Sequence, residues 1–353
     1  FTSCLRIVRR KMNHIDSELV ERAVALADNE LFPKALEVDT QGTVPASQLD
    51  LICEAGFHGL FVSSEFGGLG VSPQTQWAVH EAISGGCLTT SFVWAQHAGP
   101  SKAAAETTGP MKARWAEALA TGESRGGVAF AHLNRPGPPV LRADPTGKGW
   151  LFSGTAPFVT GWGHIDVVLT AARHGESIVW AMLDAKDCET LTSRRLSLAA
   201  IDSAVTVELT LDKHPVSEKA VTSVESFSDW AEKYRHGLRS NGSNPLGVAS
   251  RATSLLGSSP LDEQLHEARS RINSATAEEL PEARALLGDL CVRSTAALVA
   301  AVGGSALFVE QQAQRLARES LFLLVQGQTP EIKKHHLKLL TDSAATGRPD
   351  DGD

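Results

Sequence analysis

The feature of this sequence that most constrains its fold is a change in hydrophobic period that occurs twice along the chain. Apolar residues recur at helical spacing in the first and last parts, whereas the middle holds short β-branched and aromatic runs. This order predicts an α+β protein with an N-terminal helical domain (14–124), a central antiparallel β-domain (125–222) and a C-terminal helical bundle (223–342). The polar segment 343–353, which contains Gly and Pro, is predicted to be a disordered tail.

Both helical domains can be divided into elements by their apolar spacing and their breakers. The second predicted helix ends at Gly56, a residue type that commonly terminates helices in the left-handed conformation. In the C-terminal domain the helical period returns at Leu261, and an Ala/Leu/Val-rich stretch spans 283–302. The helices predicted for the N-terminal domain span residues 16–36, 45–56, 74–83, 91–106 and 110–120.

The central domain is predicted to be a sheet whose strands are joined by hairpins. Its clearest strand runs from Val205 to Leu211, where strict alternation places Thr206, Glu208 and Thr210 on the face opposite the apolar side chains. Turn residues between the runs favour hairpins over βαβ crossovers, so we do not expect a Rossmann domain. These turn residues lie at 145–147 and 174–175.

Charge and hydropathy limit the partners of the chain. Its 353 residues carry a formal net charge of −8, which gives no electrostatic reason to expect nucleic acid or an anionic membrane as a partner. No apolar run approaches the roughly 20 residues that a membrane span needs, because Gly, Arg or Glu interrupts the longest candidates. The sequence therefore predicts a soluble protein that acts on a small molecule.

The cysteines and histidines do not indicate a metal site. The five cysteines lie far apart without a Cys-x-x-Cys pair, which favours a reducing cytoplasm over a disulfide framework or a zinc site. His335 and His336 are adjacent to two lysines, and adjacent residues diverge by about 100° on a helix, so we predict a solvated helix face. The cysteines are Cys4, Cys53, Cys87, Cys188 and Cys291.

The segment Phe1 to Asn13 is basic, contains no acidic residue and does not begin with Met. We interpret it as an upstream extension that takes no part in the fold. A remnant of an organelle-targeting peptide is the alternative, because such peptides are also basic and poor in acidic residues.

No self-contained catalytic motif is present: the sequence lacks a Gly-x-x-x-x-Gly-Lys loop, a His-Glu-x-x-His pair and a Gly-x-Ser-x-Gly elbow. The order of several short segments is more informative. Ala55 to Leu60, followed by Glu65 to Gly70, resembles the N-terminal signature of the acyl-CoA dehydrogenase family, in which a similar Gly-rich loop joins two helices. The resemblance extends from about residue 16 to residue 341.

The predicted sheet carries a second part of the resemblance. Gly154 to Gly161 and Ile165 to Leu169 look like the pair of strands that lies beside the flavin ring in the family. The resemblance implies that FAD is the cofactor and that Phe158 and Thr160 lie against its ring. These residue types suit the task, because an isoalloxazine needs an aromatic wall and a donor that supports negative charge when the ring is reduced.

The C-terminal domain carries the third part. Val302 to Ser305 resembles the junction of small residues that approaches the adenine end of the cofactor, which implies that Gly303 and Gly304 contact it. Arg315 to Glu319 resembles the arginine-containing helix that follows. The turn that comes next resembles the turn beside the flavin ring, and its implied cofactor contacts are Gly327, Gln328 and Thr329.

Other segments depart from the family pattern. Residues 133–139 replace the segment that normally covers the flavin edge and the substrate, and Asn134 is the candidate flavin contact there. The helix that usually supplies an arginine to the FAD pyrophosphate is interrupted at 256–260, and Ala300 stands where the family has Gln. Weak binding of the ADP portion, or a cofactor smaller than FAD, is the expected consequence.

The departure with the largest chemical consequence is Gln326, which occupies the position of the family's catalytic glutamate. An amide cannot accept the α-proton of a thioester near neutral pH. Some relatives supply the base from an earlier helix, at a position near Gly237 in this chain, where glutamate is also absent. His236 is the alternative base, because imidazole titrates near neutrality.

The resemblance predicts a flavin-dependent CH–CH oxidoreductase that acts on an acyl thioester of CoA or of a carrier protein, with an uncertain catalytic base. Two alternatives remain at this point: a flavin-dependent monooxygenase on the same fold, and a non-catalytic paralogue that serves as a binding subunit. The family also implies a homodimer or homotetramer, because its members complete each flavin site across a subunit interface.

Overall fold

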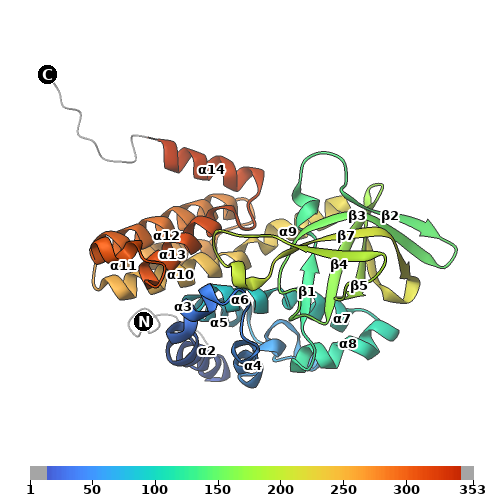
Figure 1. The fold of residues 1–353 in the computed structure, drawn as a ribbon, viewed down its shortest axis with the longest axis horizontal. Helices are drawn as coiled ribbons and strands as arrows, with labels where there is room; N and C mark the ends of the chain where they lie inside the picture. The colour runs from blue at the N-terminus through green and yellow to red at the C-terminus, as the bar shows by residue number, and fades with distance from the viewer. Residues whose placement is uncertain (1–13, 343–353) are drawn as a thin grey trace. The chain divides into compact units, whose positions relative to one another are not determined.

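The computed structural model describes residues 14–342, which divide into two compact units (Figure 1). The N-terminal unit comprises residues 14–233 and contains both the first helices and the sheet. The C-terminal unit comprises residues 234–342 and is helical. The predicted extension at 1–13 and the predicted tail at 343–353 lie outside the described residues.

The helices of the N-terminal unit follow the predicted order with two differences. The first predicted helix continues to Thr40 through a π-helical turn at Ala27–Leu31, and the predicted helix 91–106 is two helices that meet at Gln96. Gly56, with φ of 78°, ends α4 in the left-handed conformation, as predicted. The helices are α2 (His14–Leu26), α3 (Phe32–Thr40), α4 (Ala46–Glu54), α5 (Pro73–Gly86), α6 (Leu88–Ala95), α7 (Ala98–Glu106) and α8 (Pro110–Thr121).

The described part of the chain forms one eight-stranded sheet, in the order β6-β7-β3-β2-β4-β5-β8, with β1 paired to β4. The sheet is mixed, because β1 and β2 each pair with β4 in parallel, so the prediction of a purely antiparallel domain was wrong in this respect. Parallel pairing arises because β4 follows β2 only after the intervening strand β3. The strands are β1 (Gly126–Ala129), β2 (Leu141–Thr146), β3 (Gly149–Val159), β4 (Val167–His174), β5 (Ser177–Asp184), β6 (Leu191–Arg195), β7 (Val207–Ser217) and β8 (Val221–Ser226).

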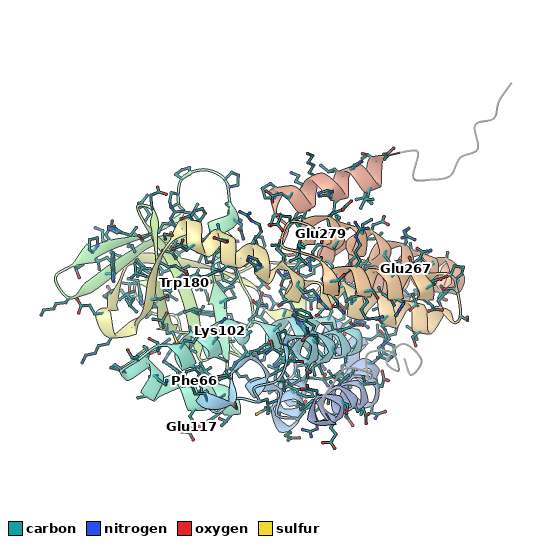
Figure 2. All side chains as sticks on the ribbon, turned by 180° about the vertical axis from the view of Figure 1, so that it is seen from behind. Phe66, Lys102, Glu117, Trp180, Glu267 and Glu279 are labelled. Atoms are coloured by element: carbon teal, nitrogen blue, oxygen red, sulfur yellow. The ribbon has the colours of Figure 1, made fainter. Side chains whose placement is uncertain are left out.

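Both predicted hairpin connections are present. β2 and β3 pair through the turn after Thr146, and β4 and β5 pair through the turn after His174. The inner face of the sheet buries aliphatic side chains such as Leu141, and α7 packs against β1 and β4 (Figure 1). Trp180, labelled in Figure 2, lies on β5, and its indole N–H donates to Glu225 Oε1 at 2.8 Å, which ties β5 to β8.

The start of β7 differs from the predicted strand. Val205 precedes the strand in the left-handed conformation, with φ of 47°, and the regular alternation begins at Val207. Thr206, predicted on the face opposite the apolar side chains with Glu208 and Thr210, lies before the strand and is 2% exposed.

The C-terminal unit is a bundle built around α12 (Leu280–Val302), which packs against α10, α11, α13 and α14. The run Leu280–Leu307 is long and apolar enough to cross a membrane by length and composition, with a mean hydropathy of 1.6, so the expectation that no run would qualify was wrong. Its central position among four helices accounts for this apolar character. The other helices are α9 (Phe227–Asn241), which crosses the boundary between the units, α10 (Ser243–Leu256), α11 (Leu261–Ser274), α13 (Gln312–Val325) and α14 (Pro330–Thr341).

Two polar features of this bundle are buried. Arg315 and Glu319 form an ion pair on α13 in which the side chains are 1% and 2% exposed. His336 on α14 is also buried, and a Cβ atom at Gly288 would lie 2.6 Å from its Nε2. The prediction that His336 lies on a solvated face was therefore wrong, because packing of α14 on α12 covers that side of the helix.

Candidate functional site

Phe158 lies near the end of β3 in an unusual conformation. Its φ of 60° is in the left-handed region, which a bulky residue rarely adopts, and the pairing of β3 with β7 is irregular between Ala156 and Val159. Its side chain is 50% exposed, and the guanidinium of Arg135 lies 5.9 Å from the ring centroid. The irregularity thus directs an aromatic ring outward from a strand whose neighbouring side chains are buried.

Thr160, two residues further along, has the opposite environment. Its side chain is 2% exposed, and its hydroxyl lies 3.1 Å from the hydroxyl of Thr206. The next peptide N–H, that of Gly161, donates to the carbonyl of Ala204 at 2.9 Å. The hydroxyl that resemblance assigns to the flavin is therefore held by the segment that leads into β7.

Asn134 lies at the end of the short 3-10 helix Ala131–Asn134, and its side chain is half-buried. His132 in the same turn is buried, and its Nε2 lies 2.9 Å from the carbonyl oxygen of Ala171 on β4. Burial lowers the pKa of His132 to about 4, so its imidazole is neutral at pH 7. The turn that carries Asn134 is therefore tied to the sheet by a neutral side chain.

The predicted contacts for the adenine end of the cofactor lie at the end of α12. Gly303 has φ of 74° and terminates the helix, and a Cβ atom added at Gly303 or Gly304 would meet no other atom within 4 Å. Both glycines are exposed. The space beside Gly303 and Gly304 is therefore open within the described residues. The same turn contains no arginine or lysine that could bind a phosphate group.

Gln326 follows the last residue of α13, and its backbone N–H donates to Phe322. Its side-chain Oε1 is buried and has no hydrogen-bond partner among residues 14–342. No contact within the described residues shows this oxygen capping the turn. The neighbouring Gln328 donates from Nε2 to the carbonyl of Leu324 at 3.1 Å, and Thr329 caps α14 by accepting from the N–H of Ile332.

Arg284 on α12 is a charged residue that donates a hydrogen bond to this turn. It was not identified from the sequence as a candidate site residue. Its Nη2 donates to the carbonyl of Gln326 at 3.3 Å, whereas Nε and Nη1 have no partner among the described residues. Burial lowers the pKa of Arg284 to about 10, so the guanidinium stays charged at pH 7. Position 326 thus lies beside a buried cation.

The other candidate base, His236, is more exposed than Gln326. His236 and Gly237 are both exposed on α9, and a Cβ atom added at Gly237 would meet nothing within 4 Å. The pKa of Glu278 is lowered chiefly by a backbone hydrogen bond, and a smaller electrostatic contribution from His236 indicates that the imidazole lies near this acidic side chain. The structure places no hydrogen-bond acceptor around His236 that would orient it as a general base among the described residues.

Gly327 is predicted to be required for the shape of the turn. Its φ is 61°, and an added Cβ atom would lie 2.8 Å from Nδ2 of Asn241. Gly327→Ala should lower the free energy of unfolding by about 1–2 kcal/mol, because an alanine in the left-handed region is strained. Gly237→Ala is the matched control, for which helix propensity predicts a gain of up to about 1 kcal/mol. Equal effects in urea denaturation monitored by circular dichroism would contradict this assignment.

Comparisons with known proteins support the same family that the motifs suggest. Residues 15–123 match the model of the acyl-CoA dehydrogenase N-terminal domain. The mitochondrial short-chain specific acyl-CoA dehydrogenase of Bos taurus is 28% identical over 159 residues, which is 43% of this chain and 38% of that protein. The sequence match therefore covers well under two thirds of the length of this relative.

Two solved structures extend the likeness to almost the whole chain. Butyryl-CoA dehydrogenase from Megasphaera elsdenii has a TM-score of 0.79 over 96% of this chain and 99% of that chain, at 16% identity. A glutaryl-CoA dehydrogenase from Mycobacterium smegmatis, solved in complex with FADH2, has a TM-score of 0.78 over 97% and 99% of the two chains, also at 16% identity.

The fold is that of the acyl-CoA dehydrogenases, which confirms the predicted fold class. The match to the family model is confined to the N-terminal domain of this fold, at residues 15–123. The half-exposed ring of Phe158 offers the flat apolar face that an isoalloxazine needs, so the residues of the N-terminal unit fit a flavin ring.

Proposed function

We propose that this protein is a flavin-dependent oxidoreductase of the acyl-CoA dehydrogenase type whose substrate is an acyl thioester. The observation that carries the proposal is Phe158, a half-exposed aromatic ring held in strained backbone at the position that matches the family's flavin-wall residue. Backbone strain of this kind is concentrated at functional sites, where the surrounding structure compensates for it. Thr160, Asn134 and the glycines at 303 and 304 are proposed as further cofactor contacts.

FAD, when bound, supplies the acceptor for the two electrons removed from the substrate. The residues of this chain have the remaining tasks. Phe158 provides an apolar wall that excludes water from one side of the ring, and Thr160, which follows the end of β3, is the second residue that the resemblance assigns to the ring. Gln328 and Thr329 hold the shape of the turn through their hydrogen bonds.

This chain has no carboxylate at position 326 to remove the α-proton of the substrate. Gln326 is neutral, and an amide oxygen is far too weak a base for this proton near pH 7. Ordinary acyl-CoA dehydrogenation is therefore proposed to be slow. The same observation favours one second candidate, a flavin-dependent monooxygenase, because that chemistry does not need an α-proton base.

Flavin binding is the first prediction to test. We expect the purified protein, or the protein reconstituted with FAD, to show the visible absorption of a bound flavin, and we expect chromatography of the released cofactor to identify FAD. FMN as the released cofactor would support a smaller cofactor, as the weakened ADP contacts allow. A colourless protein that neither FAD nor FMN can reconstitute would overturn the proposed function and would favour the non-catalytic paralogue.

Turnover assays separate the enzymatic candidates once flavin is bound. Butyryl-CoA, octanoyl-CoA and glutaryl-CoA with a dye acceptor test dehydrogenation, and these acyl groups include those named for the similar enzymes. Oxygen-dependent reoxidation of the flavin coupled to hydroxylation of the substrate identifies the monooxygenase.

We also predict a homodimer or homotetramer. Several large apolar side chains on the C-terminal unit are at least half exposed, which is unusual for a surface that faces only water. Phe308→Glu should shift the mass measured by light scattering at micromolar concentration toward the monomer, whereas Val224→Glu on β8 should not. A wild-type monomer with flavin bound would contradict the prediction. The exposed residues are Leu307, Phe308, Val309, Leu321, Val325, Leu337 and Leu340.

A further inference from the structure

An unpaired cation lies beside the exposed ring of Phe158. The guanidinium carbon of Arg135 is 5.9 Å from the ring centroid, and Arg135 is itself exposed. The part of the chain that the structure describes, residues 14–342, forms no ion pair or hydrogen bond with this guanidinium. Its charge is therefore available to a ligand that lies on the ring.

The backbone that carries Arg135 is held by the sheet. Its N–H donates to the carbonyl of His132 at 3.1 Å, and the His132 side chain is hydrogen bonded to β4. The exposed loop 136–140 follows and contains three prolines, whose φ is fixed by their rings. At its far end the carbonyl of Val140 accepts from a backbone N–H of β3 at 2.9 Å. Both ends of the loop are thus tied to the sheet that carries Phe158.

Thr160 does not supply an exposed donor at this place. Its side chain is 2% exposed, and its hydroxyl lies 3.1 Å from the hydroxyl of Thr206, which is equally covered. The ring of Phe158, in contrast, is 50% exposed. A ligand on the exposed part of this ring therefore has the charge of Arg135 near it, whereas the hydroxyl of Thr160 is covered.

A nearby positive charge has a definite effect on a flavin. Reduction of the isoalloxazine adds two electrons, and when only one proton follows, the reduced ring carries one negative charge. A cation stabilises that charge, whereas the oxidised ring is uncharged and gains less from it. Because a guanidinium stays protonated in proteins, this effect of an arginine is present across the neutral pH range.

We propose that Arg135 raises the reduction potential of a flavin bound against Phe158, because its guanidinium balances the negative charge of the reduced ring. This inference rests on the proposed function, in which Phe158 is the flavin wall. It gives the task of supporting negative charge to an exposed cation on the segment before β2, and not to the covered hydroxyl of Thr160.

The test varies the charge at position 135 in the flavin-bound protein. Because the site is open to water, one charge should change the equilibrium between oxidised and reduced flavin by about fivefold. Arg135→Ala should therefore lower the two-electron reduction potential by about 20 mV, since a tenfold change corresponds to about 30 mV. Arg135→Lys should retain most of the wild-type potential, and Arg135→Glu should lower it further than Arg135→Ala. The difference between wild type and Arg135→Ala should shrink at about 1 M salt, which screens exposed charges.

The matched control is Arg142→Ala, which removes the same charge from another exposed position. Arg142 lies on β2 opposite Ser153, so its position is roughly 16 Å along β3 from Phe158. Arg142→Ala should leave the potential unchanged. A loss as large as that of Arg135→Ala would indicate a general effect of net charge and would contradict the role of Arg135.

The remaining outcomes separate the inference from the proposed function. Equal potentials for wild type, Arg135→Ala and Arg135→Glu, with flavin bound to each, would overturn the inference and leave the proposed function intact. Tighter binding of oxidised FAD to Arg135→Ala at an unchanged potential would also overturn it, because the guanidinium would then only cover the ring. Failure of the wild-type protein to bind flavin would overturn both. Because Arg135 is exposed and forms no ion pair within residues 14–342, its variants should fold like the wild type.

Discussion

Replacing Gln326→Glu should raise the rate of acyl-CoA dehydrogenation by about 10²-fold to 10⁴-fold, the usual contribution of a positioned general base. The substitution introduces a carboxylate at the position that, by resemblance, corresponds to the catalytic glutamate of the acyl-CoA dehydrogenases. It replaces the side-chain amide nitrogen with an oxygen and leaves the backbone hydrogen bond from residue 326 to Phe322 intact. The rate is measured with butyryl-CoA or octanoyl-CoA and a dye acceptor.

Arg284 sets the pH dependence expected for this variant. Its buried guanidinium donates to the carbonyl of residue 326, and a nearby cation lowers the pKa of a carboxylate. The carboxylate introduced by Gln326→Glu should therefore lose its proton at low pH, so the rising limb of the pH–rate profile should lie on the acidic side. Combining the variant with Arg284→Gln should move that limb to higher pH.

Two controls make this result interpretable. Gln314→Glu adds the same charge to α13 away from the turn and should not change the rate. Gln326→Leu should leave the wild-type rate about where it is, because it exchanges one group that cannot act as a base for another. If the wild-type protein already turns over acyl-CoA at rates normal for such enzymes, and Gln326→Glu does not improve it, the assignment of this turn to the catalytic position is wrong.

Arg315→Met should lower the free energy of unfolding of the C-terminal unit by about 3–5 kcal/mol, the typical cost of removing one partner from a buried ion pair. The Arg315 and Glu319 side chains are 1% and 2% exposed, so water cannot replace the lost guanidinium. Arg315 also donates from Nε to Gln312 at 2.8 Å, and this contact is lost as well. The double variant Arg315→Met with Glu319→Leu should recover most of the stability, because it removes both buried charges.

The exposed pair formed by Arg271 and Glu282 provides the control. These side chains are 52% and 49% exposed, and such pairs typically contribute less than about 1 kcal/mol, so Arg271→Met should have little effect. All seven tryptophans lie before residue 234, so their fluorescence follows the N-terminal unit, whereas circular dichroism follows the helices of both units. A loss for Arg315→Met no larger than that for Arg271→Met would show that the ion pair does not stabilise the bundle.

The order of helices, sheet and helices could be predicted from the sequence because it depends on local periods and local breakers. Gly56 ends a helix and the turns after Thr146 and His174 form hairpins, as their residue types indicated. These features depend on the backbone preferences of a few consecutive residues. The same reasoning explains why the family motifs, which are mostly turns and glycines, were recognisable in a divergent chain.

The site itself was only partly predictable. Phe158 and Thr160 were identified through a resemblance, but their environments differ, with one ring half exposed and one hydroxyl buried. Local pattern cannot distinguish them, because the irregular pairing of β3 with β7 depends on a strand about fifty residues later in the chain. The proposed cofactor contacts at Asn134, Gly303 and Gln328 stay predictions for the same reason.

What the sequence by itself determined is the order of the elements and several of the turns between them, because those choices are made by neighbouring residues. Only the tertiary structure decided which polar side chains are inside. Thr206 is buried although the sequence pattern groups it with the exposed Thr210, His336 is buried although Lys333 and Lys334 closely precede it, and Arg284 is buried without an acidic partner among residues 14–342. Burial of a polar group depends on which distant segment packs over it and on whether that segment supplies a hydrogen bond, and neither is encoded in a local period.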